Sequence, residues 1–128
     1  MTGGSFGGWT FPVPSQEFEH MPRLEWMGAD LELRYEFYSE TGELLSSSVA
    51  FKDAVAYAFK GYEHCSIDEV NAYDRIVEIS DSSWMRSLAR LGPEKKHFRM
   101  FFDELGCFDI VASSVLPQPN DVEGASGG

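Results

Sequence analysis

Cysteine is scarce in this chain of 128 residues: there are two, Cys65 and Cys107, and they lie far apart. The opening residues 1–8 lack the basic and apolar segments of a secretory signal peptide. We therefore expect a cytoplasmic protein with two free thiols and no disulfide between them. Spacings such as C-x-x-C and H-x-x-x-H are also missing, so the sequence predicts no metal site and no cofactor.

Positive charge is the second scarcity. Ten Lys and Arg residues stand against 21 Asp and Glu, which gives a formal net charge of −11. Such a domain repels nucleic-acid phosphates, and no apolar run approaches the roughly 20 residues that cross a bilayer. The charge favours a protein partner with a basic surface, although acidity also serves simply to keep a small protein soluble. We expect a monomer or weak dimer that binds neither nucleic acid nor membrane.

The chain has the size and apolar content of one domain, since 43% of its residues are hydrophobic. We expect a flexible Gly- and Pro-rich segment at 1–16, a single α+β domain at 17–116 and a disordered tail at 117–128. Trp9 and Phe11 in the first segment have the apolar surface to dock on the domain. The predicted fold is an antiparallel sheet of about five to six strands built on two hairpins, with two short helices packed on it.

Apolar and polar residues alternate most clearly in residues 31–51, which is typical of half-buried strands. Ser39 to Gly42 can form a type I turn, with Gly in the left-handed position, and so predict a hairpin. The predicted register pairs Phe37 with Leu45, Leu33 with Val49 and Leu31 with Phe51. A third strand is expected to carry Val55, Tyr57 and Phe59.

Two segments have helix-start signals. Ser66 and Glu69 form a capping box, so a helix should begin at Ile67 and carry Val70 and Tyr73 inward. After a short strand at 76–79, Asp81 or Ser82 can cap a second helix. Its apolar face is predicted to contain Trp84, Leu88 and Leu91.

A second hairpin is predicted for residues 97–113, with its turn at 103–106. The same turn geometry pairs Asp103 with Cys107, and Met100 with Ile110. One face is then entirely apolar and contains Phe98, Met100, Phe102, Phe108, Ile110 and Ala112. The opposite face contains His97, Arg99, Phe101, Cys107, Asp109 and Ser113.

Phe101 is set among charged residues on that second face. Aromatic rings beside arginine are common anchors in protein interfaces. The alternative is that a helix covers this face, so that Phe101 belongs to a second small core. The predicted partner-binding residues are Phe101, Arg99, Asp109 and Trp84, with Glu32, Glu36 and Tyr38 on the outer face of the first hairpin.

Two other functions remain open. A small enzyme or ligand-binding domain would use a pocket around His64, Cys65 and Asp74. The basic island at 86–99 has the charge to bind a phosphate, or it neutralises the protein's own carboxylates.

Three stretches are similar to a family of small uncharacterised bacterial α+β domains. They read A-Y-x-F-x-x-Y-x-H-C-S, then A-Y-D-R-I-V-E-I-x-D-S-x-W, then H-F-R-M-F-F-D-x-x-G-C-F-D-I-V-A-S-S, and span about half of the chain. Such domains resemble immunity proteins of bacterial toxin systems in size, acidity and make-up. The resemblance implies a non-enzymatic, immunity-type inhibitor that masks a basic partner protein, and it carries no catalytic residues.

Overall fold

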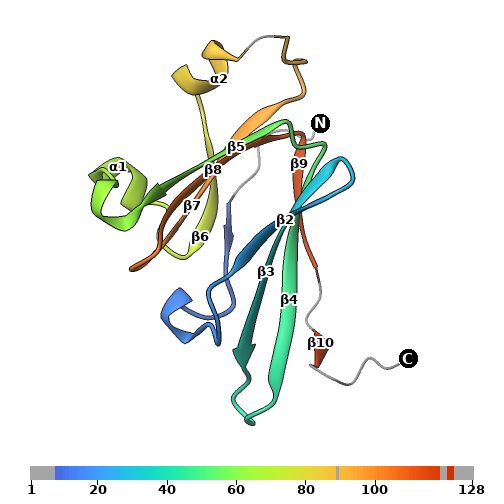
Figure 1. Cartoon of the computed structure of the whole chain (residues 1–128), viewed down its shortest axis with the longest axis vertical. Coiled ribbons are helices and arrows are strands. Elements are labelled where there is room, and N and C mark those ends of the chain that lie inside the picture. The colour runs from blue at the N-terminus through green and yellow to red at the C-terminus, as the bar shows by residue number, and fades with distance from the viewer. Residues whose placement is uncertain (1–7, 89, 119–120, 123–128) are drawn as a thin grey trace.

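The computed structural model describes residues 8–88, 90–118 and 121–122, and shows two antiparallel sheets packed over one core (Figure 1). Sheet A has the strand order β1-β6-β7-β8-β5. Sheet B has the order β10-β4-β3-β2, with β9 also paired to β4. The strands of sheet A are β1 (Trp9–Thr10), β5 (Ala56–Gly61), β6 (Arg75–Ile79), β7 (Lys96–Phe102) and β8 (Gly106–Ala112). Those of sheet B are β2 (Arg23–Met27), β3 (Asp30–Tyr38), β4 (Leu44–Lys52), β9 (Ser114–Pro117) and β10 (Asp121–Val122).

The first hairpin, β3–β4, has the predicted register. Phe37 pairs with Leu45, Leu33 with Val49 and Leu31 with Phe51. Gly42 has φ +87°, the left-handed conformation that the turn requires. The alternation therefore places the apolar side chains of β3 in the core between the sheets.

The second hairpin, β7–β8, forms where expected, but its predicted register is wrong by two residues. Phe102 pairs with Gly106, and Met100 pairs with Phe108 rather than Ile110. The physical reason is the position of the three-residue loop, which lies at 103–105 instead of the expected 104–106, with Glu104 at φ +63°. A shift of two residues leaves every side chain on its face, so the six predicted apolar residues of this hairpin all lie in the core.

The predicted α+β class is wrong, because the described residues form mostly strand and their helices are very short. The α-helices α1 (Ile67–Val70) and α2 (Ser83–Ser87) have 4 and 5 residues, and η1 (Ser15–Glu17) and η2 (Tyr62–His64) are 3-10 turns. The predicted capping box at Ser66 is present. α2 ends at once because Leu88 is extended, with ψ 136°, so Leu88 and Leu91 add no apolar helix face. None of the described helices is long and apolar enough to span a membrane.

The structured region extends beyond both expected boundaries. Trp9 pairs with Ile76, and Phe11 is buried in the main core. At the other end Pro117 belongs to β9, and β10 pairs with β4. The segments expected to be flexible thus contribute strands, except that residues 1–7, 119–120 and 123–128 lie outside the described residues.

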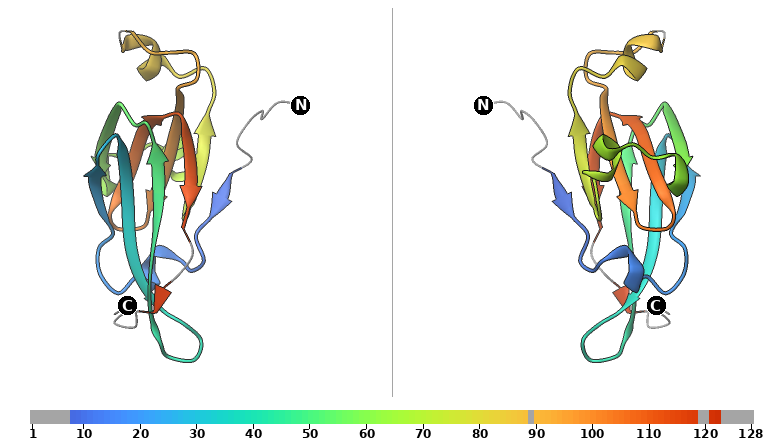
Figure 2. Two further views of the ribbon diagram at one scale, coloured as in Figure 1. Left: turned by 90° about the vertical axis from the view of Figure 1, so that its right-hand side faces the viewer. Right: turned by 90° about the vertical axis from the view of Figure 1, so that its left-hand side faces the viewer.

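The outer faces of the two sheets differ. The η2–α1 segment lies against sheet A (Figure 2), where Ala72, Phe101 and Cys107 form a second small core. Val70 and Tyr73, expected to point inward from α1, are instead exposed. In the described part of the chain no helix lies on the outer face of sheet B (Figures 1 and 2).

Candidate partner-binding surface

The structure separates the predicted binding residues into three places. Phe101 is only 1% exposed and Asp109 is buried, both beneath η2 and α1 on sheet A, where the half-buried Arg99 pairs with Asp109. The expectation that Phe101 is a surface anchor is therefore wrong, and its alternative, a covered second core, is what the fold shows. Trp84 lies on α2 against the ring of His97. The remaining predicted residues, Glu32, Glu36 and Tyr38, lie on the outer face of sheet B.

Asp109 is the centre of a buried polar network. Its Oδ1 accepts hydrogen bonds from Arg99 Nε at 2.8 Å and from His97 Nε2 at 2.5 Å. Burial raises the pKa of the Asp109 carboxyl, but the hydrogen bonds from His97 and Arg99 outweigh it and hold the pKa below its ordinary value. The direct pairing of β7 with β8 places Arg99 opposite Asp109, where the predicted register had them diagonal.

Ser82, His97 and Asp109 form one hydrogen-bonded chain. Ser82 Oγ lies 2.8 Å from His97 Nδ1, and the same oxygen accepts from Met85 N as the N-cap of α2. A hydrolase triad has this order of groups. Here, however, Arg99 shares the carboxylate, and all three residues of the chain are buried. The arrangement therefore connects α2 to sheet A, next to a pocket of about 300 Å³ that Ser82 and His97 help to line.

Three potential metal ligands also meet in this network. One ligand atom each of Glu69, Cys107 and Asp109 lies within 4.8 Å of the others. Lys60 Nζ already binds Glu69 at 2.7 Å, as Arg99 binds Asp109. Burial and the nearby Asp109 carboxylate raise the pKa of the Cys107 thiol, and a thiol binds metal as the thiolate. The donor set does not fit a cation, because two side-chain cations already neutralise the carboxylates.

The basic island at 86–99 is largely paired with the protein's own carboxylates. Arg86 pairs with Asp81 at 2.5 Å, and Arg99 with Asp109. Lys95 Nζ donates to the backbone oxygen of Asp53 at 2.7 Å. These contacts favour the neutralising interpretation of the island over a phosphate site.

The residues of the enzyme alternative do not converge. Cys65 Sγ donates to the backbone oxygens of Lys60 and Gly61, while Asp74 Oδ1 accepts from Ser15 N. Burial raises the pKa of the Cys65 thiol, which disfavours a reactive thiolate. No hydrogen bond or ion pair of the described residues joins any two of His64, Cys65 and Asp74.

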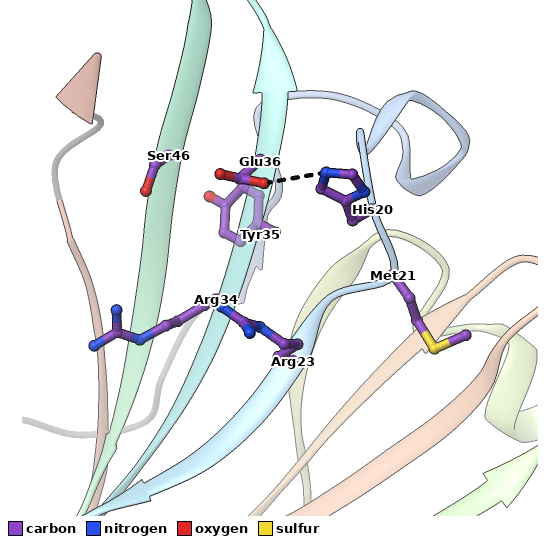
Figure 3. Close-up of a pocket in the computed structure, with 7 residues that line it drawn as sticks. All are labelled: His20, Met21, Arg23, Arg34, Tyr35, Glu36 and Ser46. Carbon is purple, nitrogen blue, oxygen red and sulfur yellow. Dashed lines mark ion pairs between the residues drawn. The ribbon is translucent and has the colours of Figure 1, made fainter. Parts of the chain in front are cut away.

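A pocket of about 350 Å³ opens on the outer face of sheet B (Figure 3). Phe18 pairs with Phe37, and Arg23 pairs with Arg34. Between these two pairs the first segment has four residues, 19–22, and β3 has only two, 35–36, so the first segment bulges and leaves a pocket. His20 Nε2 lies 3.8 Å from Glu36 Oε1 in this pocket, and Arg34 pairs with Glu25 and Glu32 at 3.3 Å each. The charges around this pocket are thus mixed and mostly paired.

The most unusual surface is the side of the molecule where β2 and β5 end their sheets. In both views of Figure 2 these two strands lie along the same side. Trp26 on β2 is 49% exposed, and Tyr57 and Phe59 on β5 are 47% and 48% exposed. We call these three residues the open side.

Pairing explains why the rings of the open side are only half covered. Trp26 pairs with Leu31, and Tyr57 pairs with Ile110, so both side chains point toward the core between the sheets. Among the described residues no further strand lies beyond β2 or β5. The ring centroids of Trp26 and Tyr57 are 6.3 Å apart, so the rings span the gap between the two edge strands.

Sequence reasoning placed Tyr57 and Phe59 in a third strand, but it gave Trp26 no role. The signal for this strand was the alternation of Tyr57 and Phe59 with the small residues Ala56 and Ala58. That pattern does not reveal that β5 is an edge strand, because strand order depends on long-range pairing.

Comparisons with known proteins give no match: no family model, no curated protein and no solved structure is similar to this chain.

Proposed function

We propose that this chain is a non-enzymatic protein-binding domain, an immunity-type inhibitor that masks a basic partner protein. The observation that carries the proposal is the open side, where three half-exposed aromatic rings lie next to two strand edges that no other described strand pairs with. Large exposed aromatic residues mark interaction surfaces, free strand edges are templates for pairing with another chain, and protein interfaces use both.

Charge supports a basic partner. The formal net charge is −11, and many of the basic side chains are already bound to carboxylates of the same chain. The remaining negative field attracts a positive surface and speeds its encounter with the domain.

The proposed mechanism has two steps with different salt dependence. The acidic field first brings the partner near, and the open side then buries its rings against it. Salt screens exposed charges over about 10 Å at 0.1 M, so it should slow association. Burial of apolar rings controls dissociation, which should change much less.

The test uses the partner recovered from the native host with the intact chain as bait. Raising salt from about 0.05 M to 0.3 M should slow association roughly tenfold or more and leave dissociation within about threefold. Tyr57→Ala and Phe59→Ala should each weaken binding by about 1–3 kcal/mol, mainly through faster dissociation. The proposed surface replaces the sequence-based placement of Tyr38 among the binding residues. Tyr38→Ala is therefore the matched control, because Tyr38 is 50% exposed but lies at the β3–β4 hairpin.

The outcome that rejects the proposal is equally specific. The proposal is rejected if the bait recovers no protein partner from the host and the chain also turns over a small molecule, with the turnover lost in Cys65→Ser or His64→Ala. Equal losses in Tyr57→Ala and Tyr38→Ala would reject the open side as the surface.

A further inference from the structure

The backbone of β5 has a free hydrogen-bonding edge whose residues can be identified. Tyr62 N donates to Leu105 O at 3.1 Å, which continues the β5–β8 register by one pair beyond Gly61–Gly106. Alternate residues of an antiparallel strand direct their N–H and C=O groups to the same neighbour. The amides of Ala56, Ala58 and Lys60 therefore face β8, while those of Tyr57 and Phe59 face away.

The alternation rests on the Tyr62–Leu105 bond. The Cys65 thiol lies at the end of the strand and donates to the carbonyls of both Lys60, at 3.5 Å, and Gly61, at 3.4 Å. Tyr57 and Phe59 thus present unpaired backbone groups together with half-exposed rings at one edge. An extended peptide that pairs with such an edge gains main-chain hydrogen bonds and pockets for alternate side chains.

The side chains of β5 leave room for a close neighbour. Ala56 and Ala58 point to the outer face of sheet A, and Lys60 is held against Glu69 at 2.7 Å. On the other edge strand, β2, Arg23 and Glu25 project from the outer face, and charged side chains of this kind discourage strand pairing. The edge of β5 is therefore the better template.

Charges at the two ends of β5 select the occupant. Asp53 precedes the strand and Glu63 follows it, both are exposed, and neither carboxylate belongs to an ion pair of the described residues. In an antiparallel pair of two β5 strands, Asp53 of one copy would lie near Glu63 of the other. Like charges in that position repel, so the edge disfavours a second copy and favours lysine or arginine.

From these observations we infer that the edge of β5 takes up an extended, basic segment of the partner as an added strand. The inference rests on the proposed function and specifies how the partner is held. The added strand bonds to the backbone of Tyr57 and Phe59, packs between their rings, and places basic side chains near Asp53 and Glu63.

The probe is a short peptide of alternating Lys and Val, added to the isotope-labelled intact chain. Binding should slow amide exchange at Tyr57 and Phe59 and leave Ala58 and Lys60, which already face β8, unchanged. The same peptide N-methylated on its Val residues keeps every charge and side chain but loses the backbone N–H donors of those residues. It should bind about tenfold more weakly, the loss expected for one to two hydrogen bonds.

Two variants and one further peptide complete the test. A Glu–Val peptide should not bind, and Asp53→Asn with Glu63→Gln should weaken the Lys–Val peptide several-fold. Two results overturn the inference of an added strand. One is peptide binding that does not slow amide exchange at Tyr57 and Phe59, and the other is binding that N-methylation does not weaken. Neither result bears on the proposed function, which the salt dependence of partner binding tests separately. Failure to bind at about 1 mM peptide also overturns the inference of an added strand. If amide exchange at Tyr57 and Phe59 slows as the protein concentration rises with no peptide present, the edge pairs with a second copy of the chain and the inference is overturned.

Discussion

At the scale of single residues, Asp109 is the group on which most of the outer face of sheet A depends. Its carboxylate holds the side chains of His97 and Arg99, and through His97 it reaches Ser82 at the start of α2. Buried charge is costly unless it is paired and hydrogen-bonded. The network therefore links the start of α2 to β7 and β8 through one ionised side chain.

We predict that Asp109→Asn lowers the free energy of unfolding at pH 7 by about 1.5–3 kcal/mol, because charged hydrogen bonds are lost. The pKa of Asp109 is lowered in the folded state. The ionised carboxylate therefore stabilises the fold above the ordinary carboxyl pKa of about 3.9, and this stabilisation is lost as pH falls through that value toward the folded pKa. The difference between wild type and Asp109→Asn should therefore shrink below about pH 5.

Urea unfolding followed from pH 7 into acid measures this difference. Glu43→Gln is the matched control, because Glu43 is exposed and belongs to no ion pair of the described residues. Its unfolding curve should run parallel to that of the wild type. A wild-type to Asp109→Asn difference that stays constant down to about pH 3 would contradict the role given to the carboxylate.

At the scale of elements, the two hairpins differ in how tightly their glycines are enclosed. Gly106 has φ +142°, and a Cβ added there would lie 2.1 Å from Lys60 O, on the backbone of β5. Gly42 also has a positive φ, +87°, but an added Cβ meets nothing within 4 Å. Gly106 therefore allows β8 and β5 to approach, whereas Gly42 serves only its turn.

Gly106→Ala should accordingly destabilise the protein by clearly more than Gly42→Ala. The second variant is expected to cost only about 1–2 kcal/mol, the penalty for a side chain in the left-handed region. Thermal or urea unfolding of both variants measures the contrast. Equal losses would mean that the β5–β8 approach at Gly106 is looser than the structure shows.

Local patterns predicted the strands well because a period of two is set by neighbouring residues. The β3–β4 register followed from alternation and one turn, and the core face of β7–β8 survived a register error of two residues. The position of the β7–β8 loop could not be predicted, since a three-residue loop fits either residues 103–105 or residues 104–106. Helix lengths failed for a similar reason: apolar spacing at Trp84, Leu88 and Leu91 suggested a helix that the extended Leu88 ends.

The candidate site was predicted only in part. Alternation places Phe101 opposite the core, which is correct, but it does not reveal that η2 and α1 cover that face. It also places Tyr57 in a strand without showing that β5 is an edge strand. Both facts depend on which elements become neighbours in space, and neighbour order is a property of the whole chain.

At the scale of the whole molecule, the surfaces have distinct characters. Sheet A is covered by short helical segments that are fixed by a polar network, and sheet B has an outer face of paired charges. The open side between them combines exposed rings with strand edges that no other described strand covers. An acidic molecule with one such side is suited to bind a basic protein through it.

The most direct test of that claim is site-specific photo-crosslinking in the native host. A photoreactive phenylalanine analogue replaces Tyr57 on the open side, or Tyr38, which is similarly exposed but lies on the outer face of sheet B. The account predicts a covalent adduct with one basic protein from position 57 and little or none from position 38. Adducts from position 38 alone, or none from position 57, would contradict it.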